Sequence, residues 1–570
     1  MTVLDTPMGA IGRLSIPKLL VVLGGFTVLT VIFFWPWVAH LSTALIGPPE
    51  DNMQDFWNSA HAAGARSWRD FIFTRQMRFP EGVSLTYAGF AWPQVFAVAL
   101  LSKIFGAEFS TLVALHNITL LASFPVGAAA MFYLARHLLG DTPGRDIGAA
   151  VAGFIFAFNP WHVAQAMHHA HVTGIEFLPL FVLFYLKALE QRSWRLLFAA
   201  AAMAALGALN CWYYFFYAFY FLAFHLLYLR VHNAKWPRGW ALIAPALCMA
   251  GATVLLLPWF VPMVITGLKN PVYYVGSNMF VADLAAFIAF PPTHLLARYG
   301  SGIYAALTGN AWESTVYLGL VNLAVLGWVL TRKGPKTLLY YALGGMIFFA
   351  VIAGGEALHV AGHVTPLHLP GVILAKLPFF ANVRTPARAM VMVYLFLGLA
   401  LAQATVMALK YRKPATRAAL GIALVLMLLD FAPTNLAATP ATCSAGLNVI
   451  ANDTSTFGVL DLPRGYGEGN AAMTQSVCHG KPIVQGETAR HLVDTLADRL
   501  VTGDLAAQQR QLTAAKVKYI VLHHPPARAS APGEEGELHR WNKADGNMAD
   551  YARHYTPVHQ DKDMTVLRVY

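Results

Sequence analysis

The sequence predicts a mostly α-helical protein that crosses a membrane many times and carries a small α/β domain in its C-terminal part. Of the 570 residues, 57% are hydrophobic and only 12% are charged, whereas about 25% of the residues of a soluble domain carry charge. Apolar segments long enough to cross a bilayer recur along the chain. From about residue 436 the composition becomes that of a water-soluble domain. These observations exclude a soluble globular enzyme.

About eleven apolar segments are predicted to cross the membrane. They are 17–40, 111–135, 147–160, 173–189, 194–210, 212–230, 240–265, 313–331, 337–353, 387–409 and 416–432. The short loops that this assignment places on one side are all basic, namely 136–146, 187–195, 230–238, 332–336 and 410–417. Because cytoplasmic loops are rich in Lys and Arg, we expect these loops and the N-terminus in the cytoplasm and the membrane to be a bacterial inner membrane. The net charge of +11 then requires no nucleic-acid partner.

The first outer loop, 42–110, mixes aromatic residues such as Trp57 and Trp68 with arginines such as Arg66 and Arg75. That mixture is typical of amphipathic helices lying on a membrane surface. Its apolar piece, 93–105, is short for a span and is predicted to be a juxtamembrane helix. We therefore divide the chain into a transmembrane domain, 1–435, which includes this loop, and a periplasmic α/β domain, 436–570.

The periplasmic domain contains three apolar runs typical of strands, at 459–462, 519–522 and 564–569. Residues 492–512 have helical spacing. Cys443 and Cys478 lie in this polar region, where an oxidising compartment permits a disulfide. The sequence does not define the distance between them, so a disulfide and two free thiols both remain open. Cys211 and Cys248 lie in apolar segments and are predicted to be small core residues.

The first candidate for chemistry follows the first apolar segment, where Glu50, Asp51 and Asp55 stand in a chain poor in carboxylates. On a helix, Asp51 and Asp55 share a face, and a carboxylate there can act as a general base. The alternative is structural. Asp51, preceded by two prolines, would cap a helix whose acidic first turn suits the helix dipole.

Other ionisable residues gather in the remaining outer loops, and polar groups near the hydrocarbon boundary are candidates for function. His168, His169, His171 and Glu176 lie between two short spans. Their spacing fits no metal-binding template, so hydrogen bonding and proton handling in a polar cavity are favoured over a divalent metal. The alternative is a set of histidines reaching toward lipid headgroups.

Two further outer segments are polar. The loop 266–312 contains Tyr273, Tyr274, Asp283 and His294, with Glu313 just after it, and it suits a loop that covers a ligand. An ordinary surface loop is the alternative. Arg384 and Arg388 stand at the outer mouth of a span, where arginine is suited to phosphate or to anionic lipid headgroups.

Several stretches carry a resemblance to a known family. They are Asp51-Asn52-Met53-Gln54 with Trp57, Arg78 to Leu85, Phe156 to Pro160 with His169, Glu176 to Leu180, Leu377-Pro378 with Arg384 to Arg388, and His479 to Pro482. In this order and spacing, over roughly 40–490, the chain resembles the GT-C-type membrane glycosyltransferases. That superfamily includes protein mannosyltransferases, aminoarabinose transferases and oligosaccharyltransferases.

The resemblance implies transfer, with inversion, of a sugar from a polyprenyl-phosphate donor to a periplasmic glycan, lipid or protein. It implies Asp51 as the catalytic residue, with Asp55 as the closest substitute. The second outer loop lacks the Asp-x-Asp pair of metal-dependent oligosaccharyltransferases, so no metal or other cofactor is expected. The residues expected to bind substrate are His169, Glu176, Asp283, His294, Glu313, Arg384 and Arg388.

Two other functions stay open. A transporter or flippase of lipid-linked sugars would show charges near the middle of its spans and broken helices in paired halves. The spans here are nearly free of charge, and no such repeat is found. A non-catalytic membrane protein that binds polysaccharide would tolerate substitution of Asp51, His169 and Arg384.

Overall fold

The computed structural model describes residues 16–86, 89–269, 278–377, 383–411, 414–464, 466–488, 494–524 and 548–570. The chain forms two compact units. The first comprises Met1–Ala39, Thr119–Pro258 and Tyr273–Ala437, and the second comprises His40–Ile118, Trp259–Val272 and Ala438–Tyr570. The segment that follows the first apolar helix thus groups with the C-terminal part of the chain.

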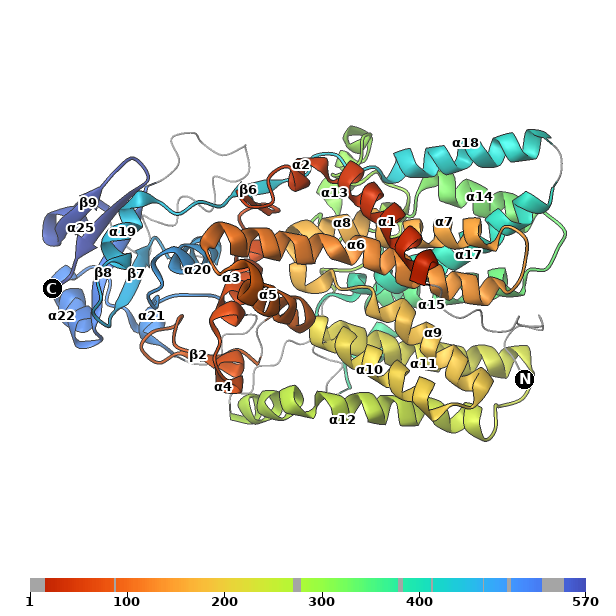
Figure 1. The fold of residues 1–570 in the computed structure, drawn as a ribbon, viewed down its shortest axis with the longest axis horizontal. Coiled ribbons are helices and arrows are strands. Elements are labelled where there is room, and N and C mark those ends of the chain that lie inside the picture. The colour runs from red at the N-terminus through yellow and green to blue at the C-terminus, as the bar shows by residue number, and fades with distance from the viewer. Residues whose placement is uncertain are drawn as a thin grey trace. The chain divides into compact units, whose positions relative to one another are not determined.

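The first unit is built from apolar helices (Figure 1). They are α1 (Ile16–Phe33), α2 (Trp35–Val38), α6 (Phe109–Leu139), α7 (Arg145–Ala157), α8 (Pro160–His168), α9 (Phe177–Gln191), α10 (Trp194–Asn210), α11 (Trp212–His232), α12 (Trp240–Lys269), α14 (Leu320–Leu330), α15 (Thr337–Ala353), α17 (Met390–Lys410) and α18 (Pro414–Phe431). The first residues of α6 and the last of α12 belong to the second unit.

Each of the eleven predicted spans overlaps at least one of these helices. Among the described residues, eight helical segments are long and apolar enough to cross a membrane, while α10, α14, α15 and α5 (Trp92–Phe105) are shorter apolar helices. The predicted span 313–331 is helical only from Leu320. Glu313 to Gly319 are not helical, and Gly319 has a positive φ of 90° directly before α14.

α17 lies at the centre of the first unit, where all residues from Met390 to Ala408 are buried. It packs against α7 and α15, and also contacts α14 and α18. Glycines permit the closest approach, because a Cβ on Gly148 of α7 would lie 2.7 Å from the Ala402 carbonyl oxygen and one on Gly398 of α17 would lie 3.0 Å from that of Ala152. Small residues at such contacts are typical of helices that pack within a membrane.

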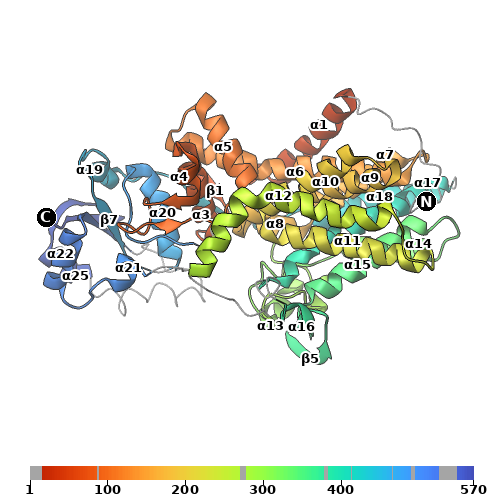
Figure 2. The same cartoon turned by 90° about the horizontal axis from the view of Figure 1, so that it is seen from below.

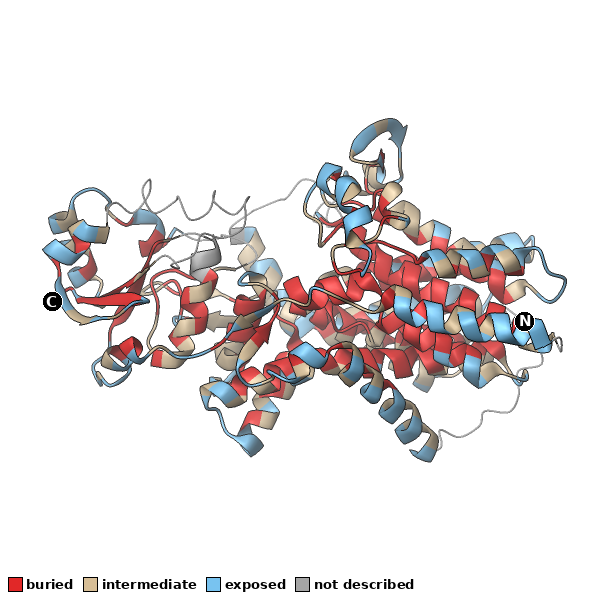
Figure 3. Cartoon of the chain, turned by 90° about the horizontal axis from the view of Figure 1, so that it is seen from above, coloured by how far each residue is buried: buried red, intermediate tan, exposed pale blue. Residues whose placement is uncertain are grey.

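The outer helices expose large apolar side chains, among them Val21 and Ile32 of α1, Val254 and Leu268 of α12, and Leu429 of α18. Figure 3 shows the buried interior and the exposed residues around it. Apolar surface of this extent is unfavourable in water. The unit is therefore that of a multi-pass membrane protein whose outer helices face lipid.

The two ends of the helices in the first unit differ in charge. Lys18 of α1 and Arg136 of α6 both form ion pairs with Asp146 of α7, which holds the start of α1, the end of α6 and the start of α7 together. The other basic loops connect α9 to α10, α11 to α12, α14 to α15 and α17 to α18. The connections from α8 to α9 and from α10 to α11 lie at the opposite helix ends.

The remainder of the first unit is a small cluster of short elements, in which Figure 2 shows α13, α16 and β5 together. These elements are η2 (Ala285–Phe287), η3 (Ala297–Tyr299), α13 (Ser301–Ala306), β4 (Ala357–Val360), β5 (His363–His368), α16 (Gly371–Leu374) and η5 (Pro386–Ala389). β4 and β5 form an antiparallel hairpin. Tyr273 and Tyr274 of the predicted covering loop lie outside the described residues.

The second unit begins with β1 (Ala44–Ile46), which pairs with β6 (Ala438–Pro440). Between them in sequence come α3 (Asp51–Gly64), α4 (Trp68–Ile72), the strand pair β2 (Phe73–Thr74) and β3 (Val83–Ser84), and α5. α3 packs against α5 and against α20 (Tyr466–His479). Cys443 and Cys478, the latter on α20, form a disulfide, which resolves one open alternative. Cys211 and Cys248 are buried free cysteines, as predicted.

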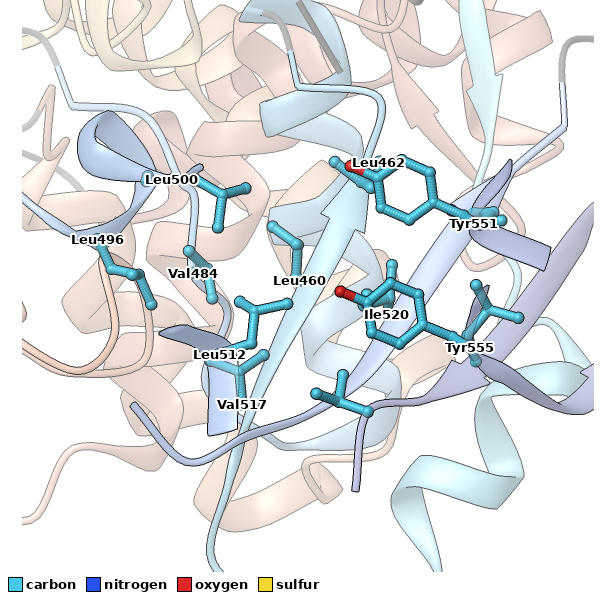
Figure 4. Packing of buried hydrophobic residues seen from close by; sticks show 14 residues of the cluster. Leu460, Leu462, Val484, Leu496, Leu500, Leu512, Val517, Ile520, Tyr551 and Tyr555 are labelled. Carbon is cyan, nitrogen blue, oxygen red and sulfur yellow. The ribbon is translucent and has the colours of Figure 1, made fainter. Parts of the chain in front are cut away.

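The C-terminal part has a four-stranded mixed sheet, as the α/β prediction requires. Its order is β7 (Gly458–Leu462), β8 (Val517–His523), β10 (Met564–Arg568) and β9 (Thr556–Gln560). β7 is parallel to β8, and the other pairs are antiparallel. Figure 4 shows its core, in which Leu460 and Ile520 of the sheet pack with Leu512, Tyr551 and Tyr555 from helices and loops.

One prediction in this part was wrong, and one strand was missed. The helix expected over 492–512 is, in its described part, two helices, α21 (Leu496–Arg499) and α22 (Leu505–Ala514). α21 ends just before Leu500, whose backbone is extended, and Gly503 has a φ of 88°. Asp504 then caps α22 by accepting a hydrogen bond from Ala507 N at 2.9 Å. The edge strand β9 was not predicted, because its sequence is polar and mostly exposed.

Candidate functional site

Glu313 and Arg388 form a buried ion pair in the first unit. Arg388 Nε lies 3.0 Å from Glu313 Oε1 and 3.3 Å from Oε2, and Nη2 also donates to Oε1. Arg388 lies in η5, whose first residue is Pro386, and α17 follows directly. Pro386 suits the first position of a helical turn, because the backbone N–H at that position would have no partner within the helix. The pair therefore connects the segment before α14 to the start of α17.

The histidine-rich segment joins this ion pair. His169 Nε2 lies 3.6 Å from Glu313 Oε1, and Gln165 Nε2 donates to Glu313 Oε2 at 3.3 Å. The ring of His168 stacks on Trp312 with centroids 3.8 Å apart. Burial first, and then the charge of Arg388, hold the pKa of His169 well below its usual 6.5. His169 is therefore neutral, and Arg388 is the ionic partner of Glu313.

The position of these residues follows from the Asn159-Pro160 sequence. Asn159 Oδ1 accepts a hydrogen bond from His162 N at 2.9 Å and so caps α8, with Pro160 as the first helical residue. α8 is entirely buried and ends at His168, so its last turn carries Gln165 toward Glu313. A capped and buried helix holds these polar side chains in one geometry.

The Arg388 guanidinium also contacts Tyr213 of α11. Its carbon lies 5.3 Å from the centroid of the Tyr213 ring, a cation–π distance, and Thr385 N donates to Tyr213 Oη at 3.3 Å. Asn210 Nδ2 donates to the His171 carbonyl oxygen at 3.1 Å. A Cβ on Gly174 would lie 2.3 Å from the Asn210 amide carbon, so a side chain there would displace Asn210.

The other predicted substrate-binding residues of this unit lie elsewhere. Asp283 accepts hydrogen bonds at 2.8 Å from the backbone N–H groups of Ala285, Ala361 and Gly362, which fastens the β4–β5 turn. His294 Nε2 lies 3.2 Å from Asp430 Oδ1 at the end of α18. These contacts give both residues structural partners, and their role in substrate binding stays a prediction.

Glu176 and Arg384 differ from the buried pair. Glu176 immediately precedes α9 and makes no side-chain cap. One of its carboxylate oxygens has no hydrogen-bond partner among the described residues. Arg384 is exposed, four residues before the buried Arg388. The structure therefore brings together His169, Glu313 and Arg388. The two arginines differ in exposure, since Arg384 is exposed and Arg388 is buried.

The acidic segment after the first apolar helices opens α3 in the second unit. Asp51 is the first residue of α3 and is half-buried, and Asp55 is buried one turn later. The N-cap position belongs to Glu50, and no side chain caps the helix. The interpretation of Asp51 as the cap was therefore wrong. Asn52 instead holds the turn, accepting from Glu50 N at 3.1 Å and donating to the Ile46 carbonyl oxygen at 2.9 Å.

The remaining turns of α3 are buried against polar as well as apolar groups. Ser59 Oγ donates to the Asp55 carbonyl oxygen at 3.2 Å and lies 2.9 Å from His116 Nδ1. Trp57 Nε1 donates to Ser476 Oγ of α20 at 3.2 Å. α3 was expected to lie on a membrane surface, but ten of its residues are buried. It is a fixed element that positions Asp51 at its exposed end.

A third carboxylate, Glu487, lies in the same unit. Gln54 Nε2 of α3 donates to the Glu487 carbonyl oxygen at 3.1 Å, and Arg78 Nε donates to the carbonyl oxygen of Gly486 at 2.8 Å. Burial raises the pKa of the Glu487 carboxyl, and the charge of Asp51 adds to that effect. The charge of Arg78 opposes this shift and that of Asp498 adds to it.

Four residues of these two groups were not singled out from the sequence: Gln165, Trp312, Tyr213 and Glu487. Trp312 stands beside the predicted Glu313, and Gln165 lies between the quoted Asn159-Pro160 and His168, so proximity was a usable signal for both. No sequence signal marked Tyr213 or Glu487. Among the described residues, no group of three or more His, Cys, Asp or Glu side chains is placed to hold a metal ion, and metal independence stays a prediction.

Comparisons with known proteins give fold-level similarities only. No protein-family model and no curated protein matches the chain. Among solved structures, the chain is similar to the archaeal oligosaccharyltransferase AglB from Archaeoglobus fulgidus, in complex with an inhibitory peptide and a dolichol-phosphate. The identity is 13%, the TM-score is 0.48, and the match covers 89% of this chain and 69% of that one.

Two further structures show a similar level of agreement. The apo form of the Archaeoglobus fulgidus oligosaccharyltransferase matches at 12% identity and a TM-score of 0.49, over 90% of this chain and 70% of that one. ArnT from Cupriavidus metallidurans, bound to undecaprenyl phosphate, matches at 12% identity and a TM-score of 0.41, over 97% and 98%. At these values the similarity concerns the path of the chain, and the chemistry has to be argued from the chain's own residues.

Proposed function

We propose that the protein is a GT-C-type membrane glycosyltransferase that moves a sugar from a polyprenyl-phosphate donor to a periplasmic acceptor, with inversion. The observation that carries this proposal is the setting of Asp51. It is a half-buried carboxylate at the first turn of α3, and the eight residues that follow it are all buried. A general base has to be accessible to the acceptor and held in one position, and Asp51 meets both requirements.

The direction of the chain in the membrane supports a periplasmic site. The basic connections in the first unit lie at one set of helix ends, which the positive-inside rule assigns to the cytoplasm. The ends of α8 and α10 and the start of α17, where His169, Glu313 and Arg388 meet, lie at the other set. The Cys443–Cys478 disulfide of the second unit suits an oxidising compartment such as the periplasm.

The proposed reaction is a single displacement. The hydroxyl oxygen of the acceptor attacks the anomeric carbon of the donor sugar, and Asp51 takes the hydroxyl proton. The bond from that carbon to the phosphate oxygen breaks, and polyprenyl phosphate leaves with the electron pair. Because attack and departure occur on opposite faces of the carbon, the configuration inverts. The acceptor is a glycan, a lipid or a protein of the cell envelope.

The two arginines have different roles in this proposal. Arg384 is exposed and is assigned to the donor phosphate, whose charge grows as the bond breaks. Arg388 is neutralised by Glu313 in the interior. It is assigned to hold the start of α17, and with it the segment that carries Arg384. His169, neutral beside this pair, is assigned to hydrogen bonding with substrate.

The test is the substitution Asp51→Asn, which keeps the shape of the side chain and removes the base. We expect a loss of transfer of about 100-fold or more and an unchanged melting temperature of the purified protein. Transfer is measured by mass spectrometry of envelope glycans, glycolipids and glycoproteins in a strain that lacks the gene and is complemented with each variant. Glu50→Gln is the matched control, because it removes the neighbouring carboxylate and should retain activity.

Three results would separate the alternatives. Full transfer by the Asp51→Asn variant contradicts the assignment of the base. Movement of labelled lipid-linked sugar across proteoliposomes without a new glycosidic bond identifies a flippase. Tolerance of substitution at Asp51, His169 and Arg384 together identifies a non-catalytic polysaccharide-binding protein.

A further inference from the structure

The second unit contains a cavity that does not include Asp51, Asp55 or Glu487. Its volume is ≈ 770 Å³, within the range of about 300–1,000 Å³ that ligand sites occupy. It opens beside the C-terminal half of α3. Its walls come from α3, the loop to α4, α4 itself, β2 with the two residues after it, and the end of α20. The function proposed above makes no use of this cavity.

Three arginines line it: Arg66, Arg69 and Arg75. All three are exposed, and none of them forms an ion pair with a carboxylate in the part of the chain that the structure describes. Lys103 adds a fourth cation nearby, since its Nζ donates to the carbonyl oxygen of Ala63, a lining residue, at 3.3 Å. Like charges that line one cavity repel one another, so the cluster favours binding of an anion.

The acidic residue on the wall, Asp70, forms no ion pair with these arginines among the residues that the structure describes. Asp70 Oδ2 accepts hydrogen bonds at 2.9 Å from the backbone N–H groups of Arg66 and Ser67, and these bonds hold the pKa of Asp70 below its usual range. The carboxylate is therefore used in the capping box that starts α4. It orders the loop that carries Arg66 and the helix that carries Arg69.

Stacked aromatic rings form part of the remaining wall, which also includes polar residues such as Thr74 and Ser476. The rings of Trp57 and His61 stack with centroids 4.8 Å apart and an interplanar angle of 7°. His61 Nε2 lies 2.8 Å from the Asp70 carbonyl oxygen, to which it donates. Phe73 adds a second aromatic side chain. Burial lowers the pKa of His61, so it is a neutral packing residue and the positive charge belongs to the arginines.

The cavity lies beside elements typical of a membrane surface. Trp68, which neighbours Arg69 on α4, packs against Trp92 and Trp259. α5, on which α3 packs, exposes Leu100, Ile104 and Phe105. Exposed apolar and aromatic residues on short helices lie at the headgroup level of a bilayer. At that level the abundant anionic groups are phosphates.

We propose that this cavity binds a phosphate-bearing headgroup, with the phosphate held by Arg66, Arg69 and Arg75. Arginine presents paired N–H donors that match phosphate oxygens, and the ordered α3–α4 loop holds two of the three in place. The phosphate belongs either to a membrane lipid or to a soluble phosphorylated sugar. The proposal is independent of the transfer reaction and of Asp51.

The test uses the purified full chain in neutral detergent with two probes, dioctanoyl phosphatidylglycerol and glucose 6-phosphate, titrated by thermal shift. The variant Arg66→Gln/Arg69→Gln/Arg75→Gln should bind the active probe at least about 30-fold more weakly than the wild type. The matched control, Arg510→Gln/Lys562→Gln/Arg568→Gln, removes three exposed charges elsewhere in the same unit and should bind as the wild type does. Binding should weaken as salt is raised from 50 to 300 mM.

The two probes show which kind of molecule carries the bound phosphate. Binding of the lipid alone identifies a membrane headgroup, and binding of the sugar phosphate alone identifies a soluble ligand. Should the triple variant not fold, the single variant Arg75→Gln replaces it and should weaken binding about 5-fold. The proposal is overturned if neither probe binds saturably, or if the triple or single variant binds as tightly as the control.

Discussion

Arg388 and Glu313 form a two-point ion pair inside the helix bundle, with Arg388 Nε 3.0 and 3.3 Å from the two carboxylate oxygens. Their exposed fractions are 7% and 3%. The sequence suggested Arg388 as a phosphate ligand, which stays a prediction, and the structure pairs its charge with Glu313. The pair joins two segments that are 75 residues apart in the chain at the point where α17 begins.

Removal of one partner leaves a buried charge without its counterion. We expect Glu313→Gln to lower the free energy of unfolding by about 3–5 kcal/mol, and Glu313→Leu/Arg388→Met to recover much of that loss because no buried charge remains. Denaturant unfolding in detergent micelles measures both. Glu356→Gln, a half-buried carboxylate of the same unit, is the control. An equal effect of Glu313→Gln and Glu356→Gln would contradict the role of the pair.

The exposed Arg384 should affect catalysis and leave stability unchanged. We expect Arg384→Gln to raise KM for a polyprenyl-phosphate-sugar donor about 10- to 100-fold, since a hydrogen bond to a charged group contributes about 1.5–3 kcal/mol. The melting temperature should not change, because the side chain is exposed. Steady-state transfer assays give KM. An unchanged KM would exclude Arg384 from the phosphate site.

Glu487 should make the second unit less stable as pH rises. Burial raises the pKa of its carboxyl above the usual 4.5, and Arg78 opposes that shift. A raised folded-state pKa means that the fold prefers the protonated form. The stabilising contribution is therefore present below the unfolded pKa and is lost as pH rises through the folded pKa. Glu487→Gln stays neutral, so its melting temperature should increasingly exceed that of the wild type as pH rises above the usual carboxyl pKa of 4.5.

The comparison of wild type with Glu487→Gln can also contradict this prediction. If the Glu487 carboxylate were stabilised by Arg78 more than it is destabilised by burial, the variant would lose stability as pH rises. Melting curves of wild type and Glu487→Gln at several pH values decide between the two signs.

The disulfide should stabilise the second unit. It joins cysteines 35 residues apart, and closing a loop of that length contributes about 3–4 kcal/mol in the chain-entropy account. We expect Cys443→Ala/Cys478→Ala, or reduction of the wild type, to speed hydrogen exchange in α20, which carries Cys478. The control Cys211→Ala/Cys248→Ala lacks only the free cysteines and should keep its sensitivity to reductant.

The sequence alone was sufficient to predict the helical membrane architecture and the three main strands of the C-terminal sheet, while the number of spans stays a prediction. These features depend on local hydrophobicity and periodicity, which are properties of neighbouring residues. The break between α21 and α22 was also local, over 500–503, but it was missed because apolar spacing continued across it.

Only the tertiary structure decided which polar residues act together. Glu313 contacts Arg388 and His169. Asp283 instead accepts a hydrogen bond from the Ala361 backbone, and His294 lies beside Asp430. It likewise decided that Arg388 is buried and Arg384 exposed, although four residues separate them, and that Cys443 meets Cys478. The physical reason is that pairing and burial of charge depend on distances through space. Hydrophobic pattern determines where a helix forms, and packing determines which partner each charge then finds.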